Sequence, residues 1–334
     1  MMSCQGGFFM KYTLGIDLGG TNIAAGIVDE NYNILIKGSR PTLAKRPPEE
    51  IAADMAEHCK DLCGKLGISL SDISCVGIAI PGTVNGATGI VEYANNIRFR
   101  NFPMREIFSR FSGIPEKKIA IGNDANVAAL GEAVGGAAKG TSSSVMITLG
   151  TGVGGGVILD GKVLTGCAFG GAELGHTVMV MDGRQCSCGR KGCVEAYCSA
   201  TALVNITKEK MEACHDSLMW NLCDGNIENA GGRTAFDAMR AGDKAGTEVV
   251  DEYTSYLACA IANFINIFQP EVFLIGGGIS NERDYLMKPV IEKTKKEVYS
   301  ATHTLVTDLR IAALGNDAAI VGAAALAEAE IKAK

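Results

Sequence analysis

The sequence predicts an α/β protein of two lobes, each with a core of strands and helices in the order βββαβαβα. β-rich runs and amphipathic segments follow one another in this order through residues 12–137. The opening pattern of that segment recurs from residue 145 onward, which indicates an internal duplication. The chain of 334 residues is also longer than one average hydrophobic core and suggests two lobes of roughly 150 residues. We expect a cleft between the lobes, to which each lobe offers its first hairpin turn.

Three short β-rich runs open the first lobe, at residues 12–17, 23–29 and 34–37. The turns between them, LGGTN and ENYN, are typical of an antiparallel meander. Hydrophobic periodicity then predicts alternating helices and strands. These are a helix over 48–66, a strand over 75–80, a helix over 103–111, a strand over 118–121 and a helix in NDANVAALGEAVGGA, after residue 122.

The second lobe repeats the opening of the first. ITLGTGVGGGVILDG can be laid beside LGIDLGGTNIAAGIVDE, because each has a β-run, a Gly-Thr turn and a second β-run that closes on an acidic turn, at Asp29 or Asp160. The later elements are a strand over 145–149, two helical stretches within 236–268, a strand over 271–275, a helix over 285–299, a strand over 309–313 and a final helix over 317–333. We therefore expect a small lobe of residues 1–122 plus about 310–334, and a large lobe of residues 123–309.

Composition excludes several classes of partner. The formal net charge is −6 and no basic run occurs, whereas binding to a phosphate backbone needs clustered lysine and arginine. No apolar run reaches the roughly 18 residues of a membrane span, and MMSCQGGFFMK lacks the features of a secretory signal. Twelve cysteines without an export signal indicate a reducing compartment. We expect a cytoplasmic protein that binds neither nucleic acid nor membrane.

The segment ELGHTVMVMDGRQCSCGRKGCVE, residues 173–195, has the spacing of a zinc site, H-x9-C-x-C-x4-C. Its four ligands could close a tetrahedron, which leaves no position for water and indicates a structural metal. The alternative is a chance cluster of cytosolic cysteines, but Gly189 and Gly192 stand where a chain must turn tightly around a metal. If a metal shapes this loop, Glu173, His176 and Glu195 are candidates for the groups that the loop presents. The predicted ligands are His176, Cys186, Cys188 and Cys193.

Two glycine-rich turns are candidate phosphate-binding loops. DLGGTN and GTGVGGG could point backbone N–H groups at phosphate oxygens. Neither is a Walker loop, and a strand rather than a helix follows each turn, which excludes the Rossmann fingerprint. The candidate nucleotide-binding residues are Asp17, Gly19, Gly20, Thr21 and Asn22 in the first loop, Thr151 and Gly152 in the second, and Gly276, Gly277 and Gly278 after a later strand.

Two of these assignments have a structural alternative. Asp17, at the end of the first strand, could cap its turn or face Mg²⁺ and its waters, and we favour the metal-facing role because magnesium takes one or two protein carboxylates. The glycines at 276–278 could lie flat against an adenine or ribose, or could form a plain strand-to-helix turn.

The motifs DLGGTN, GIAIPGTV, NDANVAALGE, TLGTGVGGG, ELGH and CSCGRKGCVE, in this order, resemble the ROK family of sugar kinases and sugar-responsive repressors. The similarity is greatest to its ATP-dependent glucokinases and extends from Tyr12 nearly to the end of the chain. ELGH with the cysteine motif is specific to that family, whereas the glycine loops also occur in actin, hexokinase and heat-shock ATPases. The resemblance implies a two-lobe actin-like, ribonuclease H-like ATPase fold, a homodimer or dimer of dimers, and phosphoryl transfer from Mg-ATP to the 6-hydroxyl of glucose.

The resemblance also implies roles for individual residues. Asp124 corresponds to the general base, although Asn123 or Asp124 could equally serve as a helix N-cap. His176 would place one ring nitrogen on zinc and the other toward the sugar. The implied sugar contacts are Asn123, Glu173, His176 and Glu195, with Gly82 and Asn96 in the same pocket.

Alternative functions belong to the same family. N-acetylmannosamine and N-acetylglucosamine are rival substrates, because single changes in a pocket shift sugar choice. A repressor would need an added N-terminal helix-turn-helix, but here the first phosphate loop begins at Asp17. A non-catalytic sugar sensor would be expected to lack the base or a phosphate loop, and both are present.

Overall fold

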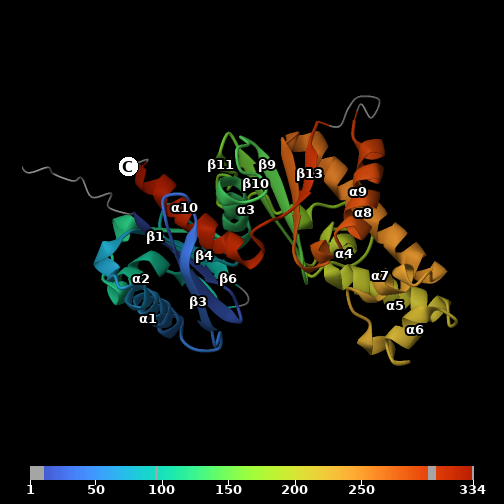
Figure 1. The fold of residues 1–334 in the computed structure, drawn as a ribbon, viewed down its shortest axis with the longest axis horizontal. Helices are drawn as coiled ribbons and strands as arrows, with labels where there is room; N and C mark the ends of the chain where they lie inside the picture. Colours follow the sequence, from blue (N-terminus) through green and yellow to red (C-terminus); the bar gives the residue numbers. More distant parts are fainter. Residues whose placement is uncertain (1–10, 95–96, 300–305, 333–334) are drawn as a thin grey trace, which may run out of the picture. The chain divides into compact units, whose positions relative to one another are not determined.

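The computed structural model describes residues 11–94, 97–299 and 306–332 and divides into two compact units (Figure 1). The first unit comprises Met1–Gly140, Val163–Gly171 and Asn316–Lys334. The second comprises Thr141–Lys162 and Ala172–Gly315. Each unit has a five-stranded sheet of its own.

The sheet of the first unit has the strand order β3-β2-β1-β4-β8. The first three strands form an antiparallel meander, and β1 pairs in parallel with β4, which pairs in parallel with β8. The five strands confirm the predicted elements and extend some of them by a few residues. They are β1 (Tyr12–Leu18), β2 (Asn22–Val28), β3 (Ile34–Pro41), β4 (Ile73–Ile80) and β8 (Ile119–Asn123).

Helices cover both faces of this sheet. α1 (Pro48–Leu66) and α2 (Met104–Ser112) share the main hydrophobic core with inward side chains such as Leu14 and Ile16. α3 (Asp124–Gly135) and α10 (Ala318–Lys332) lie on the other face, where Ala79 packs with Val127 and Ala323. The alternation of side chains along a strand explains the division, since successive residues point to opposite faces.

A small three-stranded sheet in the first unit was not predicted. β5 (Thr83–Asn85), β6 (Ile90–Ala94) and β7 (Phe99–Phe102) form an antiparallel sheet in the order β5-β6-β7. Its strands are short and its sequence, TVNGATGIVEYA, carries polar and glycine residues that weaken a periodic signal. The stacked rings of Phe99 and Phe102, with centroids 4.9 Å apart, anchor it in the core.

The sheet of the second unit repeats the topology of the first. Its order is β11-β10-β9-β12-β13, with β9 and β10 antiparallel and β9, β12 and β13 parallel. The strands are β9 (Ser144–Leu149), β10 (Val153–Leu159), β11 (Lys162–Val163), β12 (Val272–Gly276) and β13 (Asp308–Ile311). The same permutation of strands in both units agrees with the duplication inferred from the two glycine-threonine hairpins.

The helices of the second unit were predicted only in part. α7 (Thr234–Arg240), α8 (Lys244–Phe268) and α9 (Asp284–Glu297) match predicted helical stretches, and the Phe264 ring of α8 stacks parallel to Phe273 of β12. α4 (Glu195–Cys198), α5 (Ala200–Ala213) and α6 (Leu218–Leu222) were not predicted. Single 3-10 turns complete the described elements: η1 (Leu70–Asp72), η2 (Glu116–Lys118), η3 (Leu174–His176), η4 (Ile227–Asn229), η5 (Gly278–Glu282) and η6 (Gly315–Asp317).

The boundary between the units differs from the predicted one. We assigned α3 to the second lobe, but it packs in the first unit, whose chain continues to Gly140. The reason is its contact with α10: a Cβ built on Gly131 of α3 would lie 2.0 Å from the carbonyl oxygen of Ala318, so the two backbones touch. Residues 163–171 also pack in the first unit.

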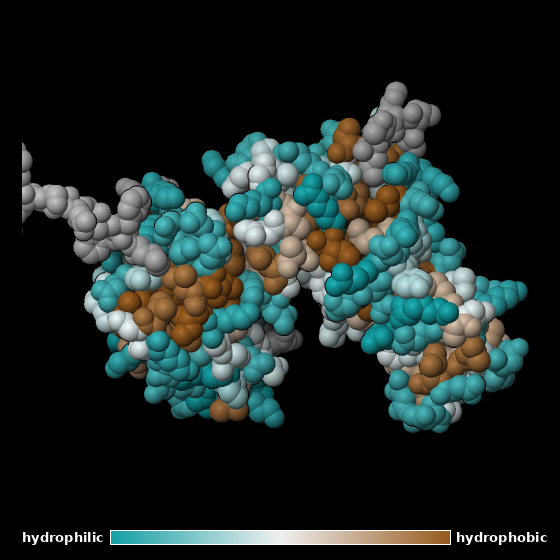
Figure 2. All heavy atoms as spheres, in the orientation of Figure 1, coloured by the Kyte–Doolittle hydropathy of each residue, from teal (hydrophilic) through white to brown (hydrophobic). Residues whose placement is uncertain are grey.

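The surface in view is largely hydrophilic, with apolar side chains gathered in a few places (Figure 2). One apolar patch lies over α5 and α6, where Leu218 and Leu222 are exposed. Among the described residues, no helix is long and apolar enough to cross a membrane.

We predict that Gly77→Ala destabilises the first unit. A Cβ on Gly77 of β4 would lie 1.7 Å from the carbonyl oxygen of Ala323, so α10 must move away from the sheet. The free energy of unfolding should fall by about 1–3 kcal/mol, as for other overpacked cores, measured by denaturant unfolding. Gly64→Ala is the control, because nothing lies within 4 Å of its Cβ and alanine should stabilise that helix by about 0.5–1 kcal/mol. Equal stability of Gly77→Ala and the wild type would contradict this account.

Candidate functional site

Polar residues of the first unit gather where its parallel strands end. Asp17 of β1 is level with Ala79 of β4, and Ile80 of β4 is level with Asn123 of β8. The carboxyl ends of these strands therefore lie at one edge of the sheet. The Asn123 side-chain amide donates a hydrogen bond to the carbonyl oxygen of Gly82 at 3.0 Å, which joins the ends of β4 and β8.

At the start of α3, the residue that caps the helix is Asn123 and not Asp124. The Asn123 side-chain oxygen accepts the backbone N–H of Asn126 at 3.1 Å and is the N-cap of the helix. Asp124 is the first residue of the helix, and one of its carboxylate oxygens accepts the N–H of Ala125 at 2.8 Å. The N-cap alternative considered for this pair therefore applies to Asn123.

The two carboxylates at this edge are both harder to ionise than ordinary aspartates. Burial, and then the nearby negative charge of Asp124, raises the pKa of Asp17 from 3.8 to about 6. Burial also raises the pKa of Asp124. Over the described part of the chain, the Asp17 carboxylate accepts no hydrogen bond, so it does not cap its own turn. Two half-buried carboxylates that repel each other form a site for a cation or a proton.

The first glycine loop is a tight turn that leaves polar side chains exposed. The N–H of Gly19 donates to the carbonyl oxygen of Asn22 at 2.9 Å, and the Thr42 hydroxyl donates to the carbonyl oxygen of Gly19 at 2.7 Å. Thr21 and Asn22 are exposed beside Gly20. Their hydroxyl and amide groups are free to face a ligand.

In the second unit, the loops at 150–152 and 276–278 also meet at the carboxyl ends of parallel strands. Thr148 of β9 is level with Gly276 of β12. Gly277 has φ of 84°, and a Cβ there would lie 2.5 Å from the carbonyl oxygen of Leu149, so only glycine allows this approach. Gly278 lies at the edge of a cavity of about 830 Å³ that is also lined by Arg233, Arg240 and Tyr285.

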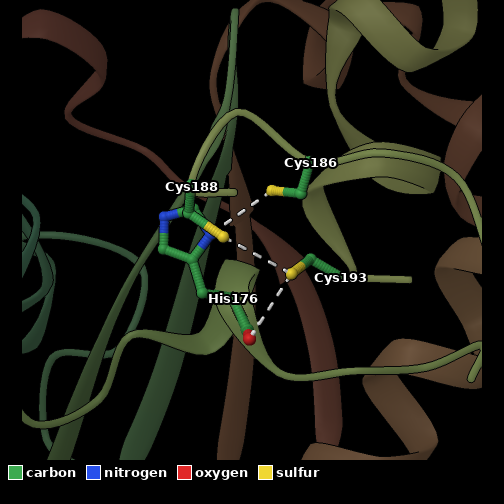
Figure 3. Close-up of side chains that lie close together, drawn as sticks. All are labelled: His176, Cys186, Cys188 and Cys193. Carbon is green, nitrogen blue, oxygen red and sulfur yellow. Dashed lines mark hydrogen bonds between the residues drawn. The ribbon is translucent and has the colours of Figure 1, made fainter. Parts of the chain in front are cut away.

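The four residues of the predicted metal site lie together in the second unit (Figure 3). Their ligand atoms are all within 4.8 Å of one another. The Cys186 sulfur is 3.7 Å from His176 Nδ1, and the Cys188 sulfur is 3.8 Å from the Cys193 sulfur. Sulfurs at 2.3 Å from a tetrahedral zinc ion lie about 3.8 Å apart, so the spacing fits such an ion.

The chemistry of the cluster also fits a cation. Burial, followed by the neighbouring Cys186 and Cys188 sulfurs, raises the pKa of the Cys193 thiol to about 12. Three thiolates cannot form side by side without a positive charge between them, whereas a bound divalent metal deprotonates its cysteines. His176, Cys186, Cys188 and Cys193 therefore form a donor set suited to zinc.

Glu195, the first residue of α4, lies between the cysteine loop and the second glycine loop. One of its carboxylate oxygens accepts the backbone N–H of Val153 at 3.1 Å, and the other accepts the Ser187 hydroxyl at 2.6 Å. One N–H of the glycine loop is therefore already bonded to protein rather than free for phosphate. The contact with Ser187 was not predicted, because a serine between two cysteines carries no signal of its own.

For the remaining predicted residues, the structure shows only contacts of the backbone or none. Glu173 is exposed and precedes η3, where its carbonyl oxygen accepts the N–H of His176 at 3.1 Å. Thr151 is also exposed, and its carbonyl oxygen accepts the Thr201 hydroxyl at 2.8 Å. Asn96 lies outside the described residues.

Comparison with known proteins places these features in a family. The model of the ROK family matches residues 13–330. The glucokinase of Thermotoga maritima is 37% identical over 322 residues, 95% of this chain and 98% of the relative. A solved ROK family glucokinase from Streptomyces griseus, in complex with glucose and AMPPNP, has a TM-score of 0.78 and 32% identity, over 95% of this chain and 99% of that chain. The N-acetylmannosamine kinase of Salmonella typhi is 27% identical over 95% of this chain and 99% of the relative.

The duplicated sheet order and the match to solved structures define the class as the two-lobe actin-like ATPase fold, as predicted. Within this class, the chain belongs to the ROK family.

We predict that Asp17→Asn stabilises the ligand-free protein at alkaline pH. The raised pKa means that the protonated form suits the fold, so this stability is fully present below pH 3.8 and is lost as the pH rises through about 6. Asparagine stays uncharged, and should raise the free energy of unfolding by about 1–3 kcal/mol at pH 8 and by little near pH 4. Denaturant unfolding with a chelator present measures both. The exposed Asp160→Asn is the control, and a less stable Asp17→Asn at pH 8 would refute the prediction.

Proposed function

We infer that the protein is an ATP-dependent hexose kinase, a glucokinase that transfers the γ-phosphoryl group of ATP to the 6-hydroxyl of glucose. The observation that carries the inference is the pair of half-buried carboxylates, Asp17 and Asp124, at one edge of the first sheet. This edge occurs in a chain that is 37% identical to a glucokinase over nearly its whole length.

Asp124 is the proposed general base. Phosphoryl transfer with a loose transition state needs the attacking hydroxyl to be oriented and its proton to be accepted late. A carboxylate whose pKa is raised by burial is a better proton acceptor than an exposed one. The hydrogen bond from the N–H of Ala125 orients one oxygen of this carboxylate, and the position at the start of α3 favours its negative charge.

Asp17 is the proposed carboxylate for magnesium. Mg²⁺ binds one or two protein carboxylates, keeps several waters and neutralises charge on the transferring phosphates. The Asp17 carboxylate accepts no hydrogen bond from the residues that the structure describes, so its oxygens are open to metal-bound water. The N–H groups and side chains at Gly19, Gly20, Thr21 and Asn22 are the proposed phosphate contacts beside it.

The second unit is proposed to hold the nucleotide. Thr151 and Gly152 would contact phosphate, and Gly276, Gly277 and Gly278 would lie against the ribose and adenine. The cavity next to Gly278 supports this assignment, because its volume of about 830 Å³ lies in the range of small-molecule sites. Arg240 lies over the Tyr285 ring and is ion-paired with Glu282, so the cavity offers planar surfaces for stacking rather than an unpaired positive charge.

A structural zinc ion is proposed to order the sugar-binding segment. It would be held by His176, Cys186, Cys188 and Cys193. Four protein ligands leave no open position on the zinc ion, so the ion would take no part in the reaction. Nδ1 of His176 faces the thiols, so Nε2 is the nitrogen left to face a sugar hydroxyl. The proposed sugar contacts are Asn123, Glu173, His176 and Glu195, with Gly82 and Asn96.

An amino-sugar kinase is the second candidate. The N-acetylmannosamine kinase of Salmonella typhi matches 95% of this chain, though at lower identity than the glucokinases. Rates of ADP formation with glucose, mannose, fructose, N-acetylmannosamine and N-acetylglucosamine separate the two. A higher kcat/KM for an acetamido sugar than for glucose would overturn the glucokinase proposal.

The homodimer stays a prediction, and light scattering would measure its molar mass. The cytoplasmic location stays a prediction as well.

We predict that Asp124→Ala lowers kcat by about 10²- to 10⁴-fold, the usual contribution of a general base. Glucose binding, measured by calorimetry, should change little, because the cap of α3 is supplied by Asn123. A coupled assay for ADP gives the rate, and the exposed Asp216→Asn serves as the control. Unchanged turnover in Asp124→Ala would reject the role of this residue.

We predict that Cys188→Ser removes one equivalent of zinc per chain, raises the KM for glucose and lowers the melting temperature. The Cys188 side chain is exposed, so the substitution leaves no cavity and acts through the metal. Elemental analysis, kinetics and thermal unfolding measure the three effects. Cys167→Ser, which changes an exposed thiol outside the cluster, should alter none of them. A wild-type protein purified without zinc would remove the basis of this prediction.

A further inference from the structure

Ser187 lies between Cys186 and Cys188, two of the four clustered metal-ligand residues. Its hydroxyl donates a hydrogen bond of 2.6 Å to Oε1 of Glu195. The Cys186 thiol is 3.5 Å from the same oxygen. The cysteine loop therefore contacts the Glu195 carboxylate directly, through the Cys186 sulfur and, at a shorter distance, through Ser187, which is not one of the four clustered residues.

The second oxygen of Glu195 is held from the opposite side. Oε2 accepts the N–H of Val153 at 3.1 Å, and it lies where a Cβ on Gly152 would come within 2.4 Å. The carboxylate is thus held between the Ser187 hydroxyl and the backbone of the second glycine loop. A free glutamate side chain would lose up to about 2 kcal/mol of conformational entropy on binding a ligand, and these two hydrogen bonds remove part of that cost beforehand.

We propose that Ser187 is a positioning residue for sugar binding. It transmits the order of the metal-binding loop to the Glu195 carboxylate and sets the direction in which that carboxylate meets a sugar hydroxyl. The proposal rests on the sugar-contact role of Glu195 given above. Each carboxylate oxygen has two lone pairs, so Oε2, which accepts the N–H of Val153, can still accept a sugar hydroxyl while it keeps this protein partner.

The pattern of contacts favours this role over that of a solvated surface serine. A hydroxyl that only faces solvent would show no short bond to an ionised acceptor, whereas hydrogen bonds to carboxylates are the short and strong ones. The loop also has little freedom at this point, since the N–H of Cys186 donates to the carbonyl oxygen of Arg190 at 2.9 Å and the N–H of Gly189 donates to that of Cys186 at 3.1 Å. Ser187 is therefore presented to Glu195 by a backbone that is already ordered.

The test is a double-mutant cycle on the full-length protein, with Ser187→Ala, Glu195→Gln and the double variant. Ser187→Ala should raise the KM and calorimetric Kd for glucose about 3- to 10-fold, as for one hydrogen bond to a charged acceptor, with kcat changed less than about twofold. In the Glu195→Gln background, the same substitution should add less than about twofold, because the carboxylate that Ser187 orients is gone. Ser187→Thr, which keeps the hydroxyl, should restore the wild-type KM.

Ser142→Ala is the matched control. Its hydroxyl also donates to a glutamate, Oε1 of Glu271 at 2.7 Å, but before the start of β9, at the opposite end of the strand from the glycine loop. This variant should leave the glucose KM unchanged.

Three results would overturn the proposal: no change in KM or Kd for Ser187→Ala, a full additional loss in the Glu195→Gln background, or loss of zinc from Ser187→Ala by elemental analysis. If Glu195→Gln itself left glucose binding unchanged, the sugar-contact role of Glu195 would fail as well. A fault in the proposed function is thereby distinguished from a fault in the role of Ser187.

Discussion

The parallel pairing of β1, β4 and β8 is the constraint on which the proposed catalytic edge depends. It brings the ends of three strands to one edge of a sheet, and the first and last of these ends are more than 100 positions apart in the chain. Asp17 and Asp124 are close enough there for the charge of one to raise the pKa of the other. This repulsion costs stability in the free protein and is relieved when a cation or a proton neutralises one of the two charges.

The contact of α10 with the sheet makes this edge rigid. Gly15 and Gly77 allow the helix backbone to touch β1 and β4, and Gly131 allows α3 to touch the same helix. α3 carries Asp124 at its first position, so the position of the proposed base is set by helix packing as well as by strand pairing. α10, which packs in the first unit although it lies far along the chain, thus helps to fix the position of Asp124.

In the second unit, hydrogen bonds through Glu195 connect the cysteine loop to the second glycine loop. Four ligand atoms converge on one point, and Ser187 and Glu195 carry the resulting order to the backbone at Val153. Under the proposed function, a structural metal at these four residues would affect sugar binding through this series of contacts. The local hydrogen bonds of the loop, such as that from Arg190 Nη1 to the carbonyl oxygen of His176 at 3.0 Å, support the same geometry.

The sequence by itself determined the duplicated fold, the family and most of the long elements, because hydrophobic periodicity, glycine turns and the cysteine spacing are local signals. It did not predict the β5-β6-β7 sheet, α4 or α6, whose short segments bury too few periodic residues to be recognised. It also missed α5, although the buried Leu203, Ile206 and Thr207 of this helix have helical spacing. Only the tertiary structure decided that α3 belongs to the first unit, that Asn123 rather than Asp124 caps it, and that Ser187 and Val153 hold Glu195. These are contacts between segments distant in the chain or choices between neighbouring side chains, and no pattern along the sequence encodes which partner lies across the space between them.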